Sequence, residues 1–103
     1  MDLQMIDEAV TEAQKALAHD DVPIGAVVTY NGNIIGRGHN TRERDNDPVG
    51  HAEINAMRDA AHHLGHWQLD DCVLYVTHEP CPMCAGAMLL SHISTVVFGA
   101  SEP

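Results

Sequence analysis

The chain has 103 residues, of which 45% are apolar and 19% are charged, a composition typical of one globular domain. Its 15 acidic and 5 basic residues give a formal net charge of −10, which disfavours unaided binding to a phosphate backbone because such binding normally needs clustered lysine and arginine. No apolar run approaches the roughly 20 residues that cross a bilayer, and the N-terminus carries no apolar signal segment. We therefore expect a cytoplasmic protein without a membrane partner.

Hydrophobic periodicity predicts a helix followed by a β-hairpin at the start of the chain. The helix has an apolar stripe with residues three and four apart and ends near residues 19–21. The stripe consists of Leu3, Ile6, Val10, Ala13 and Leu17. Residues 24–30 and 33–38 are typical of two strands, and the Asn31-Gly32 pair between them is a strong signal for a two-residue hairpin turn.

The remaining residues predict alternating helices and strands. We expect a loop over residues 39–50, a helix that carries residues 54–64 and ends at Gly65, and a strand over residues 72–77. A short buried helix over residues 82–90, with Met83 and Met88 in the core, then leads to a last strand over residues 94–98. This order predicts an α/β layered fold in a single domain, residues 1–103.

Two short motifs hold the residues best suited to chemistry, His51-Ala52-Glu53 and Pro80-Cys81-Pro82-Met83-Cys84. The spacing of Cys81 and Cys84 allows two thiolates to bind one tetrahedral zinc ion, and the start of a helix favours negative sulfur. His51, at the start of the second predicted helix, could supply a third, neutral ligand. Three protein ligands leave one position for water, which is typical of a catalytic zinc site.

Glu53 lies two residues after His51 and is placed to act as a general base rather than as a ligand. Two thiolates cancel the two positive charges of zinc, so the metal is a weaker acid than one held by three histidines. A nearby base would then help to remove a proton from water. Glu53 is therefore the predicted catalytic residue.

Other interpretations of these residues stay open at this point. Cys81 and Cys84 also have the spacing of a redox pair. A fourth protein ligand, either His78 or His92, would turn the site into a closed structural zinc site. Cys72 begins a predicted strand and is expected to be a buried structural thiol.

The pattern His-x-Glu followed by Pro-Cys-x-x-Cys is the signature of zinc-dependent nucleobase deaminases. The chain resembles the bacterial tRNA adenosine deaminases, within the cytidine deaminase-like superfamily, from about residue 22 to residue 100. Besides the two motifs, the resemblance is carried by residues 22–27, 38–40, 47–48, 74–77, 84–88 and 96–100. The Cys-Ala-Gly-Ala and Val-Phe-Gly-Ala stretches are typical of the tRNA branch in particular.

The resemblance implies a three-layer α/β/α fold whose mixed sheet combines an N-terminal hairpin with parallel strands, and it implies a homodimer. Relatives continue well beyond Pro103, so the domain is expected to lack the C-terminal strand and helix that they have.

The resemblance also implies roles at the site. Zinc would be bound by His51, Cys81 and Cys84, and Glu53 would transfer protons. Asn40 would hold the edge of the base, since a carboxamide offers both a donor and an acceptor; from the residues alone, Asn40 is also typical of a turn in a polar loop. Two further residues complete the predicted substrate site: Ile24 would line the pocket and the backbone at Ala52 would contact the base.

The function expected from these residues is zinc-dependent hydrolytic deamination of a nucleobase exocyclic amine. The favoured substrate is adenosine at the wobble position of a tRNA anticodon loop, because an unpaired base costs little to splay into a pocket. One alternative is a free base or nucleoside, such as guanine, cytosine or cytidine. Another is a non-catalytic partner subunit of a deaminase, which would need the three zinc ligands but not Glu53.

Overall fold

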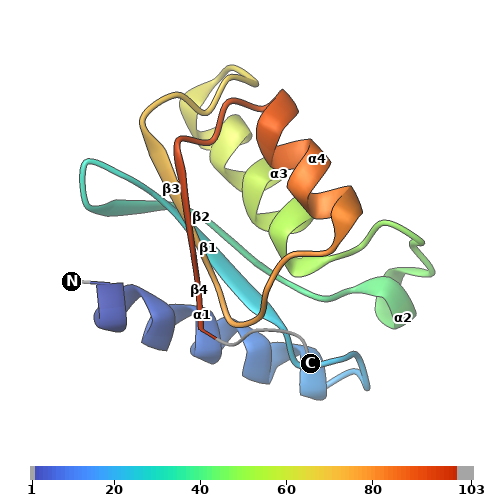
Figure 1. The fold of residues 1–103 in the computed structure, drawn as a ribbon. Coiled ribbons are helices and arrows are strands. Elements are labelled where there is room, and N and C mark those ends of the chain that lie inside the picture. The colour runs from blue at the N-terminus through green and yellow to red at the C-terminus, as the bar shows by residue number, and fades with distance from the viewer. Residues whose placement is uncertain (1, 100–103) are drawn as a thin grey trace.

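The computed structural model describes residues 2–99 and arranges them in three layers. Its elements are α1 (Asp2–Leu17), β1 (Gly25–Tyr30), β2 (Asn33–His39), α2 (Arg42–Asp45), α3 (Ala52–Leu64), β3 (Cys72–Val76), α4 (Pro82–Leu90) and β4 (Thr95–Phe98). Helix α1 covers one face of the sheet, while α3 and α4 lie together over the other face (Figure 1). This arrangement confirms the predicted α/β fold. Within residues 2–99, no helix is long and apolar enough to cross a membrane.

The four strands form one mixed sheet in the order β2-β1-β3-β4. Strand β1 runs antiparallel to both β2 and β3, whereas β3 and β4 are parallel. The predicted hairpin is confirmed, because Asn31 and Gly32 join β1 to β2 with φ angles of 51° and 79°. Two successive positive φ angles give a turn whose twist matches that of the flanking strands.

Helix α1 packs on the sheet mainly through small residues, and only part of the apolar stripe expected from its sequence is buried. Leu3, Val10 and Leu17 are 81%, 41% and 57% exposed. Two members of the predicted stripe do face the protein, since Ala13 is buried and Ile6 is half-buried. The other buried residues of the helix are Ala9, Glu12 and Ala16. Gly25 explains the difference, because a Cβ placed there would lie 2.0 Å from the carbonyl oxygen of Ala9. So close an approach leaves no room for leucine or valine between helix and sheet.

Helix α3 also approaches its face of the sheet closely, over β2. A Cβ at Gly38 would lie 2.4 Å from the backbone nitrogen of Ala56 and 2.5 Å from the carbonyl oxygen of Ala52. The first turns of α3 therefore rest directly on the backbone of β2. This contact sets the depth at which α3 begins.

The segment predicted as a loop contains the short helix α2, held by a contact distant in sequence. The backbone N–H groups of Glu43 and Arg44 donate to the carboxylate of Asp21, at 2.8 and 3.2 Å. A carboxylate at these positions satisfies helical N–H groups that have no partner within the helix. Asp21 lies more than twenty residues earlier in the chain, so local sequence does not reveal this cap.

The core between the sheet and the helix pair α3 and α4 agrees in part with the core residues predicted from the sequence. Cys72 is fully buried, as predicted, and Met88 is buried with Cys84 on the side of α4 that faces the sheet. Met83 is exposed, contrary to the prediction. One residue corresponds to about 100° around a helix, so a position adjacent to Cys84 does not share its buried face.

Candidate metal centre and active site

His51, Cys81 and Cys84 converge at the starts of α3 and α4. His51 is the residue before α3, Cys81 is the residue before α4, and Cys84 lies in the first turn of α4. His51 Nδ1 lies 3.6 Å from the Sγ atom of each cysteine. One ligand atom from each of the three residues lies within 4.8 Å of the others. The structure thus brings together the three residues predicted to bind metal.

Neither proposed fourth ligand joins this group. His92 lies with its Nδ1 atom 3.3 Å from Asp70, on the surface. The ring of His78 contacts the hydroxyl of Thr77, with Nδ1 3.2 Å from Oγ1. Within residues 2–99 the group has three members, which speaks against a closed structural site and leaves one tetrahedral position for a ligand from outside the chain.

The chemistry of these donors fits zinc. One imidazole nitrogen and two sulfurs form a soft donor set that zinc binds in tetrahedral geometry. Burial raises the pKa of Cys84 well above its ordinary value, and the negative charge of Glu53 and a hydrogen bond with Cys81 raise it further. A thiolate in these surroundings requires a cation beside it.

Glu53, the second residue of α3, is a buried carboxylate beside this group. Glu53 is only 4% exposed. Burial raises the pKa of Glu53 above its usual value, although a hydrogen bond to its own backbone and the charge of His51 act in the opposite direction. A carboxyl group whose pKa is raised toward neutrality is suited both to accept and to return a proton.

His51, Cys81 and Glu53 line a cavity of about 510 Å³ together with two of the predicted substrate residues, Ile24 and Asn40. Ile24 lies just before β1, Asn40 just after β2. The cavity is large enough for a nucleobase with part of its sugar. His78 and Arg42 also line it. From the sequence, His78 is only a candidate metal ligand, and Arg42 has no predicted role. Arg42 nevertheless lies two residues after Asn40, a predicted substrate-binding residue, and this proximity could have pointed to it.

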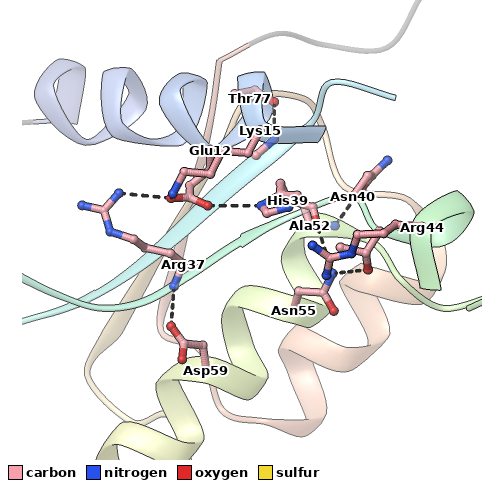
Figure 2. Close-up of polar contacts among 12 residues, drawn as sticks. Glu12, Lys15, Arg37, His39, Asn40, Arg44, Ala52, Asn55, Asp59 and Thr77 are labelled. Carbon is pink, nitrogen blue, oxygen red and sulfur yellow. Dashed lines mark hydrogen bonds and ion pairs between the residues drawn. The ribbon is translucent and has the colours of Figure 1, made fainter. Parts of the chain in front are cut away.

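Asn40 is held in place by α3. Its side-chain Oδ1 accepts the backbone N–H of Ala52 at 2.8 Å (Figure 2). The residues on either side are bound as well, since Asn55 Nδ2 donates to the carbonyl of His39 at 2.8 Å and to Thr41 Oγ1 at 2.9 Å. Ala52 is fully buried, and its backbone contact with a base stays a prediction.

A network of charged side chains also connects α1 to the end of β2, next to Asn40 (Figure 2). The buried carboxylate of Glu12 lies 2.7 Å from Lys15 Nζ, 3.3 Å from His39 Nδ1 and 3.4 Å from Arg37 Nη1. Burial alone would raise the pKa of Glu12, but the hydrogen bonds and charge of these partners lower it below the usual value. The network joins α1 to the end of β2, next to Asn40.

Comparison with known proteins gives consistent relatives. The chain is 52% identical over 96 residues to the tRNA-specific adenosine deaminase of Bacillus subtilis, a match that covers 93% of this chain and 60% of the relative. It is 49% identical to the enzyme of the same name from Streptococcus pyogenes, covering 94% of this chain and 61% of that one. The chain thus spans about three-fifths of the length of these curated relatives.

Solved structures show the same fold. A structure from a study of A-to-I editing by tRNA:A34 deaminases aligns with a TM-score of 0.94 and 40% identity over 98% of this chain and 78% of its own. The guanine deaminase of Bacillus subtilis aligns with a TM-score of 0.92 and 42% identity over 96% of this chain and 64% of its own. The family model of the cytidine and deoxycytidylate deaminase zinc-binding region matches residues 1–100. The chain therefore belongs to the zinc-binding cytidine and deoxycytidylate deaminase family.

Proposed function

We propose that the protein is a zinc-dependent hydrolytic deaminase that converts adenosine at the wobble position of a tRNA into inosine, releasing ammonia. One observation carries the chemistry: the buried carboxylate of Glu53 lines the same cavity as His51 and Cys81. A zinc site that only stabilises a fold needs its ligands but not a buried carboxylate beside them. This favours an enzyme over a non-catalytic partner subunit.

The proposed roles follow from the positions of the side chains. Zinc held by His51, Cys81 and Cys84 would supply a Lewis acid that makes water a nucleophile near neutral pH. The Glu53 carboxylate takes a proton from water and delivers it to the ring nitrogen next to the reacting carbon, and then serves the departing amine in the same way. The raised pKa of Glu53 suits both transfers.

Asn40 and Ile24 would hold the base. Asn40 Oδ1 already accepts the N–H of Ala52, so the Nδ2 amino group is the end of the carboxamide available to the substrate. It would donate to an acceptor on the edge of the base, such as a ring nitrogen or carbonyl. Ile24 offers an apolar contact to the face of the base. These contacts orient the ring and leave its exocyclic amine facing Glu53.

The tRNA substrate is supported by relatives. Two proteins about half identical to this chain are named tRNA-specific adenosine deaminases. As part of the same proposal, we expect the protein to be a cytoplasmic homodimer.

A free purine base is the second candidate substrate. The guanine deaminase of Bacillus subtilis is as similar in fold and identity as the tRNA:A34 deaminase structure is. The net charge of −10 also suits an uncharged base better than a polyanion.

The deciding experiment is mass spectrometry of deamination by the zinc-loaded protein. The substrates are an anticodon stem-loop with adenosine at the wobble position, free adenosine, cytidine, cytosine and guanine, each also incubated with the Glu53→Ala variant. A gain of about one mass unit in the stem-loop alone supports the proposal. Conversion of guanine or another free base instead would replace tRNA as the substrate, and no conversion of any compound would favour the partner subunit.

A further inference from the structure

Arg42 differs from most lysine and arginine residues of this chain in that its side chain forms no ion pair within the described residues. Only 5 residues are lysine or arginine, and three of them form ion pairs with carboxylates of the chain itself: Lys15, Arg37 and Arg44. In the part of the chain that the structure describes, neither Arg42 nor Arg58 has a carboxylate partner. Arg58 lies on α3 beside an apolar groove with Trp67, away from the candidate active site.

Arg42 instead stands between the active-site cavity and a neighbouring one. A second cavity of about 420 Å³ shares Val22, Asn40 and Arg42 with the first. A group that fills the first cavity can therefore continue into the second along Arg42. A free base has no such continuation, whereas a nucleotide within an RNA strand does.

The other side chains that line the second cavity determine which chemical groups of a ligand can lie beside Arg42. The carboxylate of Asp21 is turned inward, because its oxygens accept the N–H groups of Glu43 and Arg44 and contact His19. Asp20 and Glu43 are exposed and also line this cavity. Carboxylates accept hydrogen bonds from sugar hydroxyls but repel phosphate. Two side chains in this wall can carry positive charge, His19 and Arg42. The ring of His19 contacts the carboxylate of Asp21, which leaves the guanidinium of Arg42 as the group best placed for an anion.

We propose that Arg42 binds the phosphodiester that follows or precedes the nucleotide in the active site, and that the second cavity holds the adjoining nucleotide. This inference rests on the proposed function and names the chemistry that selects its substrate. A guanidinium forms two parallel hydrogen bonds with a phosphate. Arg42 then favours a polynucleotide over a free base or nucleoside without changing the reaction at the base.

Binding of a short single-stranded RNA with one adenosine tests this directly. Fluorescence anisotropy would compare the unmodified protein with Arg42→Gln and with Arg58→Gln, a matched loss of one exposed, unpaired cation. We expect Arg42→Gln to weaken binding roughly 5- to 30-fold and to lower the slope of log affinity against log salt by about 0.7, the value for one contact to single-stranded nucleic acid. Arg58→Gln and the melting temperatures should change little.

Kinetics supply the second readout. If the inference is right, Arg42→Gln lowers kcat/KM for the stem-loop through KM, and by a clearly larger factor than it lowers kcat/KM for any free nucleoside that is converted. Equal effects of Arg42→Gln and Arg58→Gln on RNA affinity, or no RNA binding by the unmodified protein, would overturn it. Arg42-dependent RNA binding by a protein that deaminates only free bases would leave this inference standing and remove tRNA as the substrate.

Discussion

Asn40 and Ala52 are joined by a 2.8 Å hydrogen bond in which the side chain accepts the backbone N–H. The bond connects the end of β2 to the first turn of α3, which carries Glu53. It fixes the orientation of a carboxamide whose two ends have opposite hydrogen-bonding character. One interaction therefore stabilises the helix start and decides which group Asn40 presents to the cavity.

Two substitutions separate these roles of Asn40. Asn40→Ala leaves the N–H of Ala52 buried without an acceptor and should lower the free energy of unfolding by about 1–3 kcal/mol. Asn40→Asp keeps an acceptor and should cost less, yet both variants lose the Nδ2 donor, so we expect both to lose at least ~10-fold in kcat/KM. Urea unfolding and a deamination assay measure the two effects. Full activity of Asn40→Asp would contradict the donor role.

Replacement of Glu53 should separate chemistry from metal binding. We expect Glu53→Gln to keep about one zinc per chain and to lose roughly 10²- to 10⁴-fold in kcat, the usual contribution of a general acid–base group. Inductively coupled plasma mass spectrometry gives the zinc content. A variant that retained normal turnover would show that another group carries the proton.

Removal of zinc tests the metal centre. Chelation should abolish deamination and lower the melting temperature, because the ligands from α3 and α4 lose their common partner. Cys84→Ser is expected to reproduce this loss of zinc and stability. Cys72→Ser changes another buried thiol, outside the group, and serves as the matched control that should retain the metal. Full zinc content in Cys84→Ser would contradict the assignment.

Glu12 should make the free energy of unfolding depend on pH in the acidic range. Its pKa is lowered in the folded protein, so its contribution is complete above the ordinary carboxyl pKa of 4.5 and is lost as pH falls through the lower, folded value. We expect Glu12→Gln to cost about 1–3 kcal/mol at pH 7 and progressively less below pH ~4.5. Glu8→Gln, which alters an exposed pair with Arg37, should cost less than about 1 kcal/mol. A pH-independent difference between Glu12→Gln and the unmodified protein would disprove this linkage.

Gly38 should tolerate no side chain. Gly38→Ala places a methyl group 2.4 Å from the backbone of Ala56, so α3 must shift, and we expect a loss of about 1–3 kcal/mol together with reduced activity. Gly86→Ala is the control, because a Cβ there meets nothing within 4 Å and alanine favours the helix by about 0.5–1 kcal/mol. Circular dichroism melts of both variants give the comparison.

The sequence predicted the elements and the metal-binding group well because both depend on local signals. The Asn31-Gly32 turn requires positive φ angles that few other residues adopt, and the spacing from Cys81 to Cys84 places two sulfurs on one helix turn. Two sulfurs and a histidine at helix starts are sufficient to predict a zinc site. The structure places His51 beside the two cysteines.

The errors came from contacts that are distant in sequence. The buried side of α1 depends on the absence of a side chain at Gly25, in another element, so hydrophobic periodicity placed Leu3, Val10 and Leu17 in the core although they are exposed. Helix α2 depends on Asp21, and the bond from Ala52 to Asn40 depends on how α3 packs on β2. Neither can be derived from a short window of residues.

The metal-binding group also has a consequence for folding kinetics. His51 lies 30 residues before Cys81 and 33 before Cys84, and strand β3 lies between them in the chain. Closing a loop of this length is entropically costly and slows the formation of non-local contacts. We therefore expect the complete set of three ligands to form only after α3 and α4 have docked, so the rate of zinc uptake by refolding protein should report the rate of that docking.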